Sequence, residues 1–139
     1  MTPLVLEDVL PHRGAAILLD EASIGDDGSA TCIVRITAHS RFATPSGVPA
    51  VVCLEYMAQA VAVQASVAVG GIHGGWLAGC PELELFVDAF ALGDVLRVQA
   101  RPSTPPGHTF GAIRAFFCTV HREESLLARA SLFVYEPPT

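Results

Sequence analysis

The pattern of apolar and polar positions is dominated by one long apolar segment, Val48 to Val69, which contains a single charged residue, Glu55. Pro49 suits the first turn of a helix, where its missing N–H would have no partner, and Gly70-Gly71 is expected to end the helix. A helix that is apolar on nearly all sides must be enclosed by protein or by lipid. The segment is long enough for a bilayer, but a carboxylate in mid-hydrocarbon is costly. We therefore expect a helix enclosed by the rest of the protein and no membrane span.

Shorter stretches that read as strands lie on both sides of this helix. Two precede it, joined as a hairpin through the turn Gly25–Gly28, and four follow it. A short helical turn is expected at Leu4 to Leu10, and Trp76, at a strand start, is expected in the core. The predicted strands are Ala16–Ile24, Ala30–Ile36, Trp76–Leu85 with an irregularity at Pro81, Val95–Ala100, Phe110–His121 and Leu126–Tyr135. Antiparallel strands wrapped around the helix by one apolar face would satisfy both elements, which predicts an α+β protein of the hotdog fold.

Composition narrows the possible classes of protein. A chain of 139 residues predicts one domain, 1–139. Apolar residues make up 51% and charged residues 16%, which excludes disorder. No basic-plus-apolar signal segment begins the chain, so a cytoplasmic location is expected. The net charge of −6 opposes non-specific nucleic-acid binding, and the scattered cysteines and histidines predict no metal site.

Four motifs, in order between residues 10 and 100, are similar to those of one enzyme family. They are Leu10-Pro11-His12-Arg13 followed by Ile17-Leu18-Leu19-Asp20, Gly47-Val48-Pro49 followed by Leu54-Glu55-Tyr56-Met57-Ala58-Gln59, Leu77-Ala78-Gly79, and Leu92-Gly93-Asp94. The first two are fairly specific, and the carboxyl-terminal third matches only in pattern. On these motifs the chain resembles the hotdog 3-hydroxyacyl-acyl carrier protein dehydratases, and most of all the divergent branch found in aryl-polyene clusters.

The resemblance implies a catalytic carboxylate at Glu55 and leaves two candidate histidines. Better-known members carry the motif GHFPG, and counting back from Glu55 by their spacing reaches Arg41. The nearest histidine, His39, begins the segment His39–Gly47, which holds His, Phe, Pro and Gly in the same order but spread by insertions. His39 is therefore the first candidate for the catalytic base, and His12, in the opening motif, is the second.

Dehydration requires a base that removes a proton next to the thioester carbonyl and an acid that protonates the departing hydroxyl. A carboxyl on an apolar helix is biased toward its protonated form by desolvation. Glu55 is thus expected as the acid and a neutral imidazole, His39 or His12, as the base. Gln59, one helical turn after Glu55, would orient it or a water molecule.

Four further residues are expected to bind the substrate. The backbone N–H groups of Ala50 and Val51, expected to be free at the helix start, would polarise the thioester carbonyl. Ala50 matches a glycine in the related enzymes, and Gly79 belongs to the strand motif that resembles theirs. Arg13 could meet the phosphate of a phosphopantetheine arm, although an exposed arginine is the default interpretation. No separate cofactor is expected, because the substrate brings its own phosphopantetheine.

The sequence therefore predicts a dehydratase that acts on 3-hydroxyacyl thioesters of acyl carrier protein. The resemblance implies a homodimer in which acid and base come from different subunits. One alternative is a non-catalytic hotdog subunit that forms a heterodimer with an active dehydratase, which the altered GHFPG motif favours. A second is an acyl thioesterase, which would use the helix carboxylate to activate water and which the Leu10–Arg13 opening disfavours.

Overall fold

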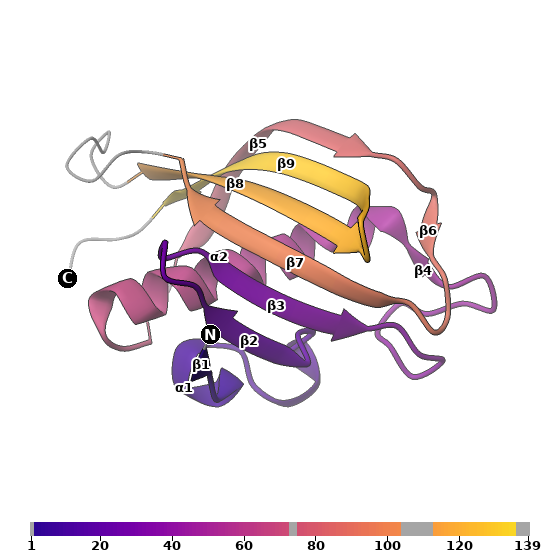
Figure 1. Cartoon of the computed structure of the whole chain (residues 1–139), viewed down its shortest axis with the longest axis horizontal. Helices are drawn as coiled ribbons and strands as arrows, with labels where there is room; N and C mark the ends of the chain where they lie inside the picture. Colours follow the sequence, from indigo (N-terminus) through magenta and orange to yellow (C-terminus); the bar gives the residue numbers. More distant parts are fainter. Residues whose placement is uncertain (1, 73–74, 104–112, 136–139) are drawn as a thin grey trace.

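A computed structural model describes residues 2–72, 75–103 and 113–135, and shows one helix packed on one face of an antiparallel sheet (Figure 1). The seven strands lie in the order β1-β2-β3-β7-β8-β9-β5, and β4 pairs with β6 separately. The strands are β1 (Thr2–Pro3), β2 (Glu21–Ile24), β3 (Ala30–Arg35), β4 (Val48–Pro49), β5 (Trp76–Leu85), β6 (Ala89–Phe90), β7 (Val95–Pro102), β8 (Ile113–Arg122) and β9 (Ser125–Tyr135). The α-helices are α1 (Leu6–Val9) and α2 (Cys53–Val69), and the 3-10 turns are η1 (Gly14–Ala16) and η2 (Ala50–Val52).

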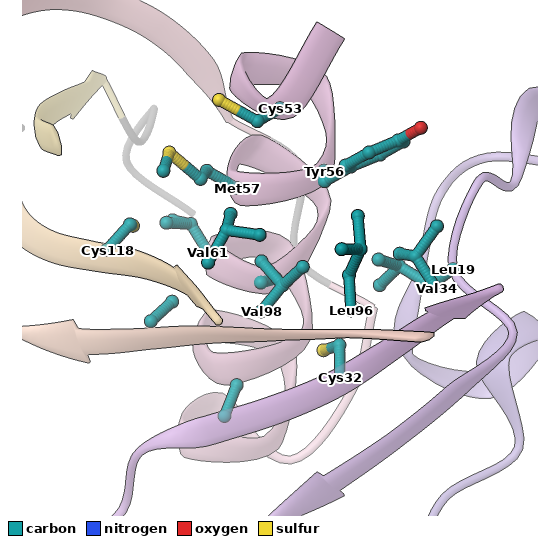
Figure 2. Close-up of a cluster of buried hydrophobic side chains, with 14 of the residues drawn as sticks. Leu19, Cys32, Val34, Cys53, Tyr56, Met57, Val61, Leu96, Val98 and Cys118 are labelled. Atoms are coloured by element: carbon teal, nitrogen blue, oxygen red, sulfur yellow. The ribbon is translucent and has the colours of Figure 1, made fainter. Parts of the chain in front are cut away.

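The core lies between α2 and the inward face of the sheet. Alternate residues of β7, such as Leu96 and Val98, are fully buried, and they meet Met57 and Val61 of α2 in one apolar cluster (Figure 2). The outward residues between them, such as Gln99, are only half-buried. This period of two places one side of each strand against the helix. The structure confirms the predicted α+β hotdog arrangement.

The helix α2 begins later than the apolar pattern predicts. Val48 and Pro49 form β4, with Val48 opposite Phe90, and Ala50–Val52 is a 3-10 turn. The backbone here pairs with β6, and the Ala50 N–H donates to the carbonyl oxygen of Asp88, just before β6. These contacts keep the chain extended, so the α-helix begins only at Cys53. The predicted end is confirmed, because Gly70 adopts a left-handed conformation with φ +79 after Val69.

One side of α2 is left open by its own chain. By length and composition the segment Ala50–Val69 could cross a membrane, and 61% of its most apolar window is buried inside the protein. Within the first three turns of α2 the exposed or half-exposed positions are spaced as on a single face. They are Leu54, Glu55, Ala58 and Ala62. The expected enclosure of the helix by the rest of the chain is therefore only partial.

The strand predictions hold in type but not always at their ends. The hairpin of β2 and β3 and the irregular β5, with register shifts on both sides of Gly79, are as expected. The predicted strand Ala16–Ile24 is wrong in its first half, because η1 and an irregular segment precede Glu21. The first residues of the predicted strand Phe110–His121 lie outside the described residues. The two-residue strands β1, β4 and β6 were not predicted, because they are too short to show a period.

Gly47 carries a strict steric requirement in the loop that leads to the site. Its φ is +106, and a Cβ there would lie 2.0 Å from the Phe90 carbonyl oxygen. We predict that Gly47→Ala lowers the free energy of unfolding by more than about 3 kcal/mol, from steric overlap added to backbone strain. The control is Gly93→Ala, where φ is +94 but no atom lies within 4 Å of the added Cβ. That change should cost only about 1 kcal/mol. Equal losses in urea unfolding would contradict the steric argument.

Candidate active site

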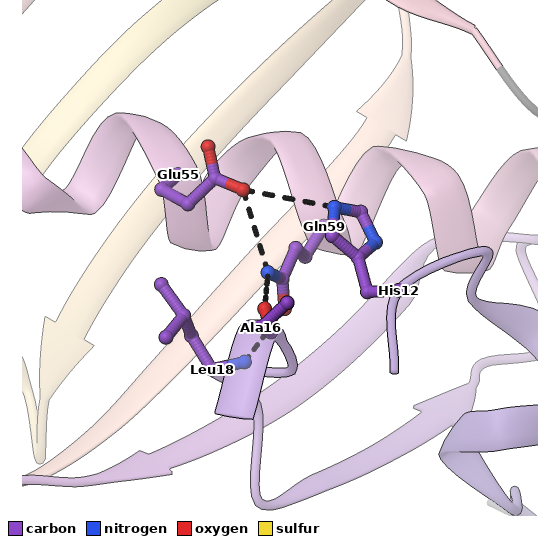
Figure 3. A network of polar contacts seen from close by, with 5 residues as sticks. All are labelled: His12, Ala16, Leu18, Glu55 and Gln59. Carbon is purple, nitrogen blue, oxygen red and sulfur yellow. Dashed lines mark hydrogen bonds and ion pairs between the residues drawn. The ribbon is translucent and has the colours of Figure 1, made fainter. Parts of the chain in front are cut away.

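The structure brings the predicted carboxylate and one candidate histidine together within a single chain. Glu55 lies in the first turn of α2, and His12 lies in the segment between α1 and η1. The His12 Nε2 is 3.7 Å from Glu55 Oε1 (Figure 3). This distance suits an ion pair or a proton shared through a small movement, and it is longer than a hydrogen bond.

His12 is positioned through its neighbour Arg13. The Arg13 Nη1 donates to the carbonyl oxygens of Leu10, at 2.6 Å, and of His12, at 2.7 Å. The guanidinium thereby folds back on the turn that carries His12, so the suggested role of Arg13 at a phosphate stays a prediction. The His12 Nδ1 is buried and has no hydrogen-bond partner in the described part of the chain. The imidazole is therefore not committed by a second protein group to one tautomer.

Gln59 connects α2 to the segment that follows His12. Its side chain is fully buried, and its Nε2 donates to Ala16 O at 2.7 Å and to Glu55 Oε1 at 3.4 Å. Its Oε1 accepts the backbone N–H of Leu18 at 2.9 Å. The predicted contact between Gln59 and Glu55 is present, and Figure 3 shows His12 and Gln59 reaching the same carboxylate oxygen.

Glu55 is less buried than the apolar sequence around it suggests. Half of its side chain, 50%, is exposed, because it lies on the open face of α2. The apolar surroundings that the sequence predicted for this carboxyl are therefore incomplete in a single chain.

Two hollows meet at the His12–Glu55 pair. The first, here called the apolar groove, follows the open face of α2 toward the start of β5. Its lining includes Ala58, Ala62, Trp76 and Leu77. The second, here called the helix-start hollow, lies on the other side of the pair, and its lining includes Leu18, Arg41, Phe42 and Val51. An apolar chain on one side and a polar head on the other could both reach the pair.

Trp76 corrects the prediction of a core residue. It is 64% exposed and stacks on Tyr135, with ring centroids 5.7 Å apart. It belongs to the edge strand β5, which explains its exposure. Trp76 forms part of the wall of the apolar groove.

His39 is placed away from the Glu55 of its own chain. It is exposed, its backbone N–H donates to Thr37 Oγ1, and it lines a separate hollow with Arg35 and Tyr56. Burial raises the pKa of Tyr56 to about 12, so its hydroxyl stays protonated at neutral pH. The expectation that His39 faces Glu55 of a neighbouring subunit involves a second chain and stays a prediction.

The expected substrate-binding residues are only partly brought together. The Ala50 N–H was expected to be free, and this prediction is wrong, because the N–H donates to Asp88 O at 2.9 Å. Val51 is 54% exposed and lines the helix-start hollow. Gly79 lies in the irregular part of β5, next to Phe133, and lines neither of the two hollows at the pair.

Sequence reasoning did not identify two residues of the helix-start hollow, Arg41 and Phe42. Counting back from Glu55 does reach Arg41, but nothing in the sequence shows that Phe42 faces the same hollow. In the described ranges, no group of three or more His, Cys, Asp and Glu side chains could hold a metal ion.

Gln59 and Gln64 form a matched pair for testing the role of the buried bridge. Both are buried, but Gln64 has one contact, 3.4 Å from its Nε2 to Gly28 O, and its Oε1 has no described partner. We predict that Gln59→Met lowers the free energy of unfolding by about 2–4 kcal/mol, because two backbone groups lose their partner. Gln64→Met should cost less than about 1 kcal/mol. Chemical denaturation measures both, and a smaller loss for Gln59→Met than for Gln64→Met would contradict the bridge.

Solved structures similar to this chain extend over nearly all of it. A chain of "The Dehydratase Heterocomplex ApeI:P from Xenorhabdus doucetiae" is 21% identical, with a TM-score of 0.82 and coverage of 98% of this chain and 93% of that one. The uncharacterised protein PH1136 from Pyrococcus horikoshii is 14% identical, with a TM-score of 0.71 and coverage of 100% and 97%. A hypothetical thioesterase with coenzyme A from Streptococcus pneumoniae is 12% identical, with a TM-score of 0.64 and coverage of 88% and 90%. These likenesses show the hotdog fold.

A search of curated proteins found no match, whereas one family model matches nearly the whole chain. The family model of the ApeP dehydratases, described as ApeP-like, matches residues 4–139. The match includes both His12 and Glu55 and nearly the whole chain. This chain belongs to the ApeP-like dehydratase family.

Proposed function

We propose that this chain dehydrates 3-hydroxyacyl groups carried as thioesters on the phosphopantetheine of an acyl carrier protein, with His12 and Glu55 as base and acid. The observation that carries the proposal is the imidazole nitrogen 3.7 Å from a carboxylate oxygen where an apolar groove meets a second hollow. Membership of a dehydratase family supports the reaction class. An apolar groove beside a base and an acid suits an acyl chain.

The reaction needs one proton on the pair at the start. Covering the pair removes water, and low dielectric disfavours two separated charges, so the neutral imidazole and the protonated carboxyl become the favoured forms. His12 Nε2 then takes the proton from the carbon next to the thioester carbonyl. The C–O bond to the hydroxyl breaks as Glu55 gives its proton to the departing oxygen, which leaves as water. A final transfer from His12 to Glu55, across the short gap between them, restores the starting state.

The remaining groups position the substrate. The acyl chain would lie along Ala58 and Ala62 toward Trp76 in the apolar groove. The carbonyl oxygen would lie near the start of the helix, where the Val51 amide is a suitable donor because the first N–H groups of a helix lack intrahelical partners. The phosphopantetheine arm would enter from the helix-start hollow.

A second hotdog subunit would supply the missing cover. Strand β5 ends the described sheet order, so one of its edges lacks a neighbouring strand. Trp76 and Leu77 at its start are 64% and 46% exposed. An exposed apolar edge strand is a ready site for pairing with another chain. The similar structure named a dehydratase heterocomplex supports a partner of the same fold, so we propose that the chain works as a dimer with itself or with another hotdog protein.

Substitution of the pair tests the chemistry. We predict that Glu55→Gln and His12→Ala each lower dehydration by about 10²–10⁴-fold, as expected for a lost acid or base. The control is His39→Ala, which should leave the rate within about twofold while the protein stays folded. Mass spectrometry of a 3-hydroxyacyl carrier protein measures the loss of water, and circular dichroism checks the fold.

Three other outcomes of these experiments would each change the proposed function. A folded His12→Ala protein with normal turnover, beside an inactive His39→Ala protein, would show that the base comes from the loop of a neighbouring subunit. Release of the free acid in place of the dehydrated thioester would favour the thioesterase alternative. Normal turnover in Glu55→Gln would remove Glu55 from the mechanism.

The exposure of Glu55 and the altered GHFPG motif also favour a second candidate function, that of a partner subunit with no activity of its own. We predict that the purified chain dehydrates the substrate alone, and that adding a second hotdog protein raises the rate only by forming more dimer. Light scattering and the dehydration assay follow both quantities. If the chain is inactive alone, and His12→Ala leaves the activity of the mixed dimer unchanged, it is a partner subunit without a complete active site.

A further inference from the structure

We propose that Phe42 contacts the thioester end of the substrate, where the phosphopantetheine arm enters, and limits how bulky the acyl group can be next to the thioester. This proposal rests on the proposed function, because it concerns the same thioester substrate. It adds a residue that determines specificity to the His12–Glu55 pair.

Phe42 borders the hollow beside the His12–Glu55 pair. Its ring lines the helix-start hollow together with His12, Val51 and Glu55. Although it faces this hollow, 57% of Phe42 is exposed. An exposed phenyl ring gains little from the hydrophobic effect until something covers it. A ligand in the hollow would cover it.

Phe42 has a backbone conformation that is unfavourable for its residue type. Its φ is +67, one of only two positive values among the described residues other than glycine. The left-handed region places the Cβ of an L-residue too close to its own backbone, and bulky residues there are rare. Glycine or asparagine would adopt this conformation at lower cost. Neither burial nor backbone preference therefore explains a phenylalanine at this position.

The surrounding loop imposes this conformation. On one side the Ala43 N–H donates to Ser40 O at 3.0 Å. On the other side Thr44 and Gly47 exchange two backbone hydrogen bonds, of 2.8 and 2.9 Å. Strained residues persist where neighbouring structure determines them, and they are concentrated at ligand sites. The loop between β3 and β4 (Figure 1) thus presents the ring toward the hollow at a cost in stability.

Arg41 supports the ring from the same loop. Its guanidinium carbon lies 5.4 Å from the centre of the Phe42 ring, within the range of a cation–π contact. Both side chains line the helix-start hollow. This contact favours the position in which the ring borders the hollow. Arg41 is a positioning residue in this scheme.

The experiment compares Phe42→Gly with the wild-type full chain on two substrates. One carries a short 3-hydroxybutyryl group and the other a bulkier 3-hydroxyacyl group branched at the carbon next to the thioester, both on the same carrier protein. Glycine removes the wall and the backbone strain together. We expect a Tm higher by a few degrees, together with a loss of roughly tenfold in kcat/KM for the short substrate, carried mainly by KM. The bulky substrate should lose less or gain, so the ratio of the two kcat/KM values shifts by about tenfold.

The matched control is Phe117→Ala. Phe117 is also stacked by an arginine, with the Arg101 guanidinium carbon 5.2 Å from its ring centre. It is half-buried on the face of the sheet opposite α2, since its neighbours Phe116 and Cys118 point inward and are buried. This change should lower the Tm and leave the ratio of kcat/KM values as in wild type. A shift of the ratio in this control equal to that of Phe42→Gly would overturn the assignment.

A binding measurement separates this proposal from the proposed function. Calorimetry uses the amide analogue of 3-hydroxybutyryl pantetheine, in which nitrogen replaces the thioester sulfur. Wild type that binds the analogue about tenfold more tightly than Phe42→Gly supports the wall. Equal binding, with an unchanged substrate ratio, overturns the role of Phe42 and leaves the proposed function standing. If wild type neither binds the analogue nor dehydrates either substrate, both proposals fall.

Discussion

The arrangement of the site depends on one buried side chain, Gln59. Its amide spans the gap between α2 and the irregular segment before β2, and it holds the Ala16 carbonyl and the Leu18 N–H at once. Those two backbone groups lie at the end of η1 and in the irregular stretch after it, where Gln59 is the partner that the structure describes for each. Unpaired backbone groups in the interior are costly, so the segment stays against the helix. His12 lies at the beginning of this segment, and its distance from Glu55 follows from the same attachment.

The second constraint is that one chain does not complete the core around its own helix. The sheet covers the side of α2 that carries Met57 and Val61, whereas the side that carries Glu55 and Ala58 stays open. A site on the open side has access for a substrate without any lid. It also leaves the carboxylate half exposed, so its environment is determined by whatever covers it. Substrate access and the proposed site for a second subunit therefore have one structural origin.

The sequence predicted the parts of this structure that have a strong period or a motif. The apolar run predicted α2, alternation predicted β7, and the opening motif supplied His12 as a candidate. The start of α2 was missed, because the pairing of Val48 with Phe90 links residues far apart in the chain. The free amide of Ala50 was wrong for the same reason, since its acceptor is Asp88.

The choice between the two histidines shows the limit of spacing as an argument. The spacing of the GHFPG motif favoured His39 over His12, because His39 is the histidine nearest to the position reached by counting back from Glu55. Within one chain, the structure places His12 beside Glu55 and His39 in a separate hollow. Turns of the loop carry His39 toward Tyr56, and the Gln59 bridge brings the more distant His12 to the carboxylate. The hydrogen bonds of Gln59 to Ala16 and Leu18 close the long stretch of chain between His12 and Glu55. Closing such a long stretch costs little more entropy than closing a short one, because the cost grows only slowly with length.

Placing the proposed base and acid on the same chain also changes what a second subunit would contribute. If each subunit lent one group to the other, loss of the dimer would separate the proton donor from the acceptor. With His12 and Glu55 3.7 Å apart in one chain, the proton can return from one to the other without crossing an interface. The contribution left to a partner is then physical, because covering the open face of α2 removes water from the pair. Removing water strengthens the electrostatic interaction of both groups with a bound substrate. In the proposed mechanism, assembly would thus determine how much water reaches the pair, while a single chain determines its geometry.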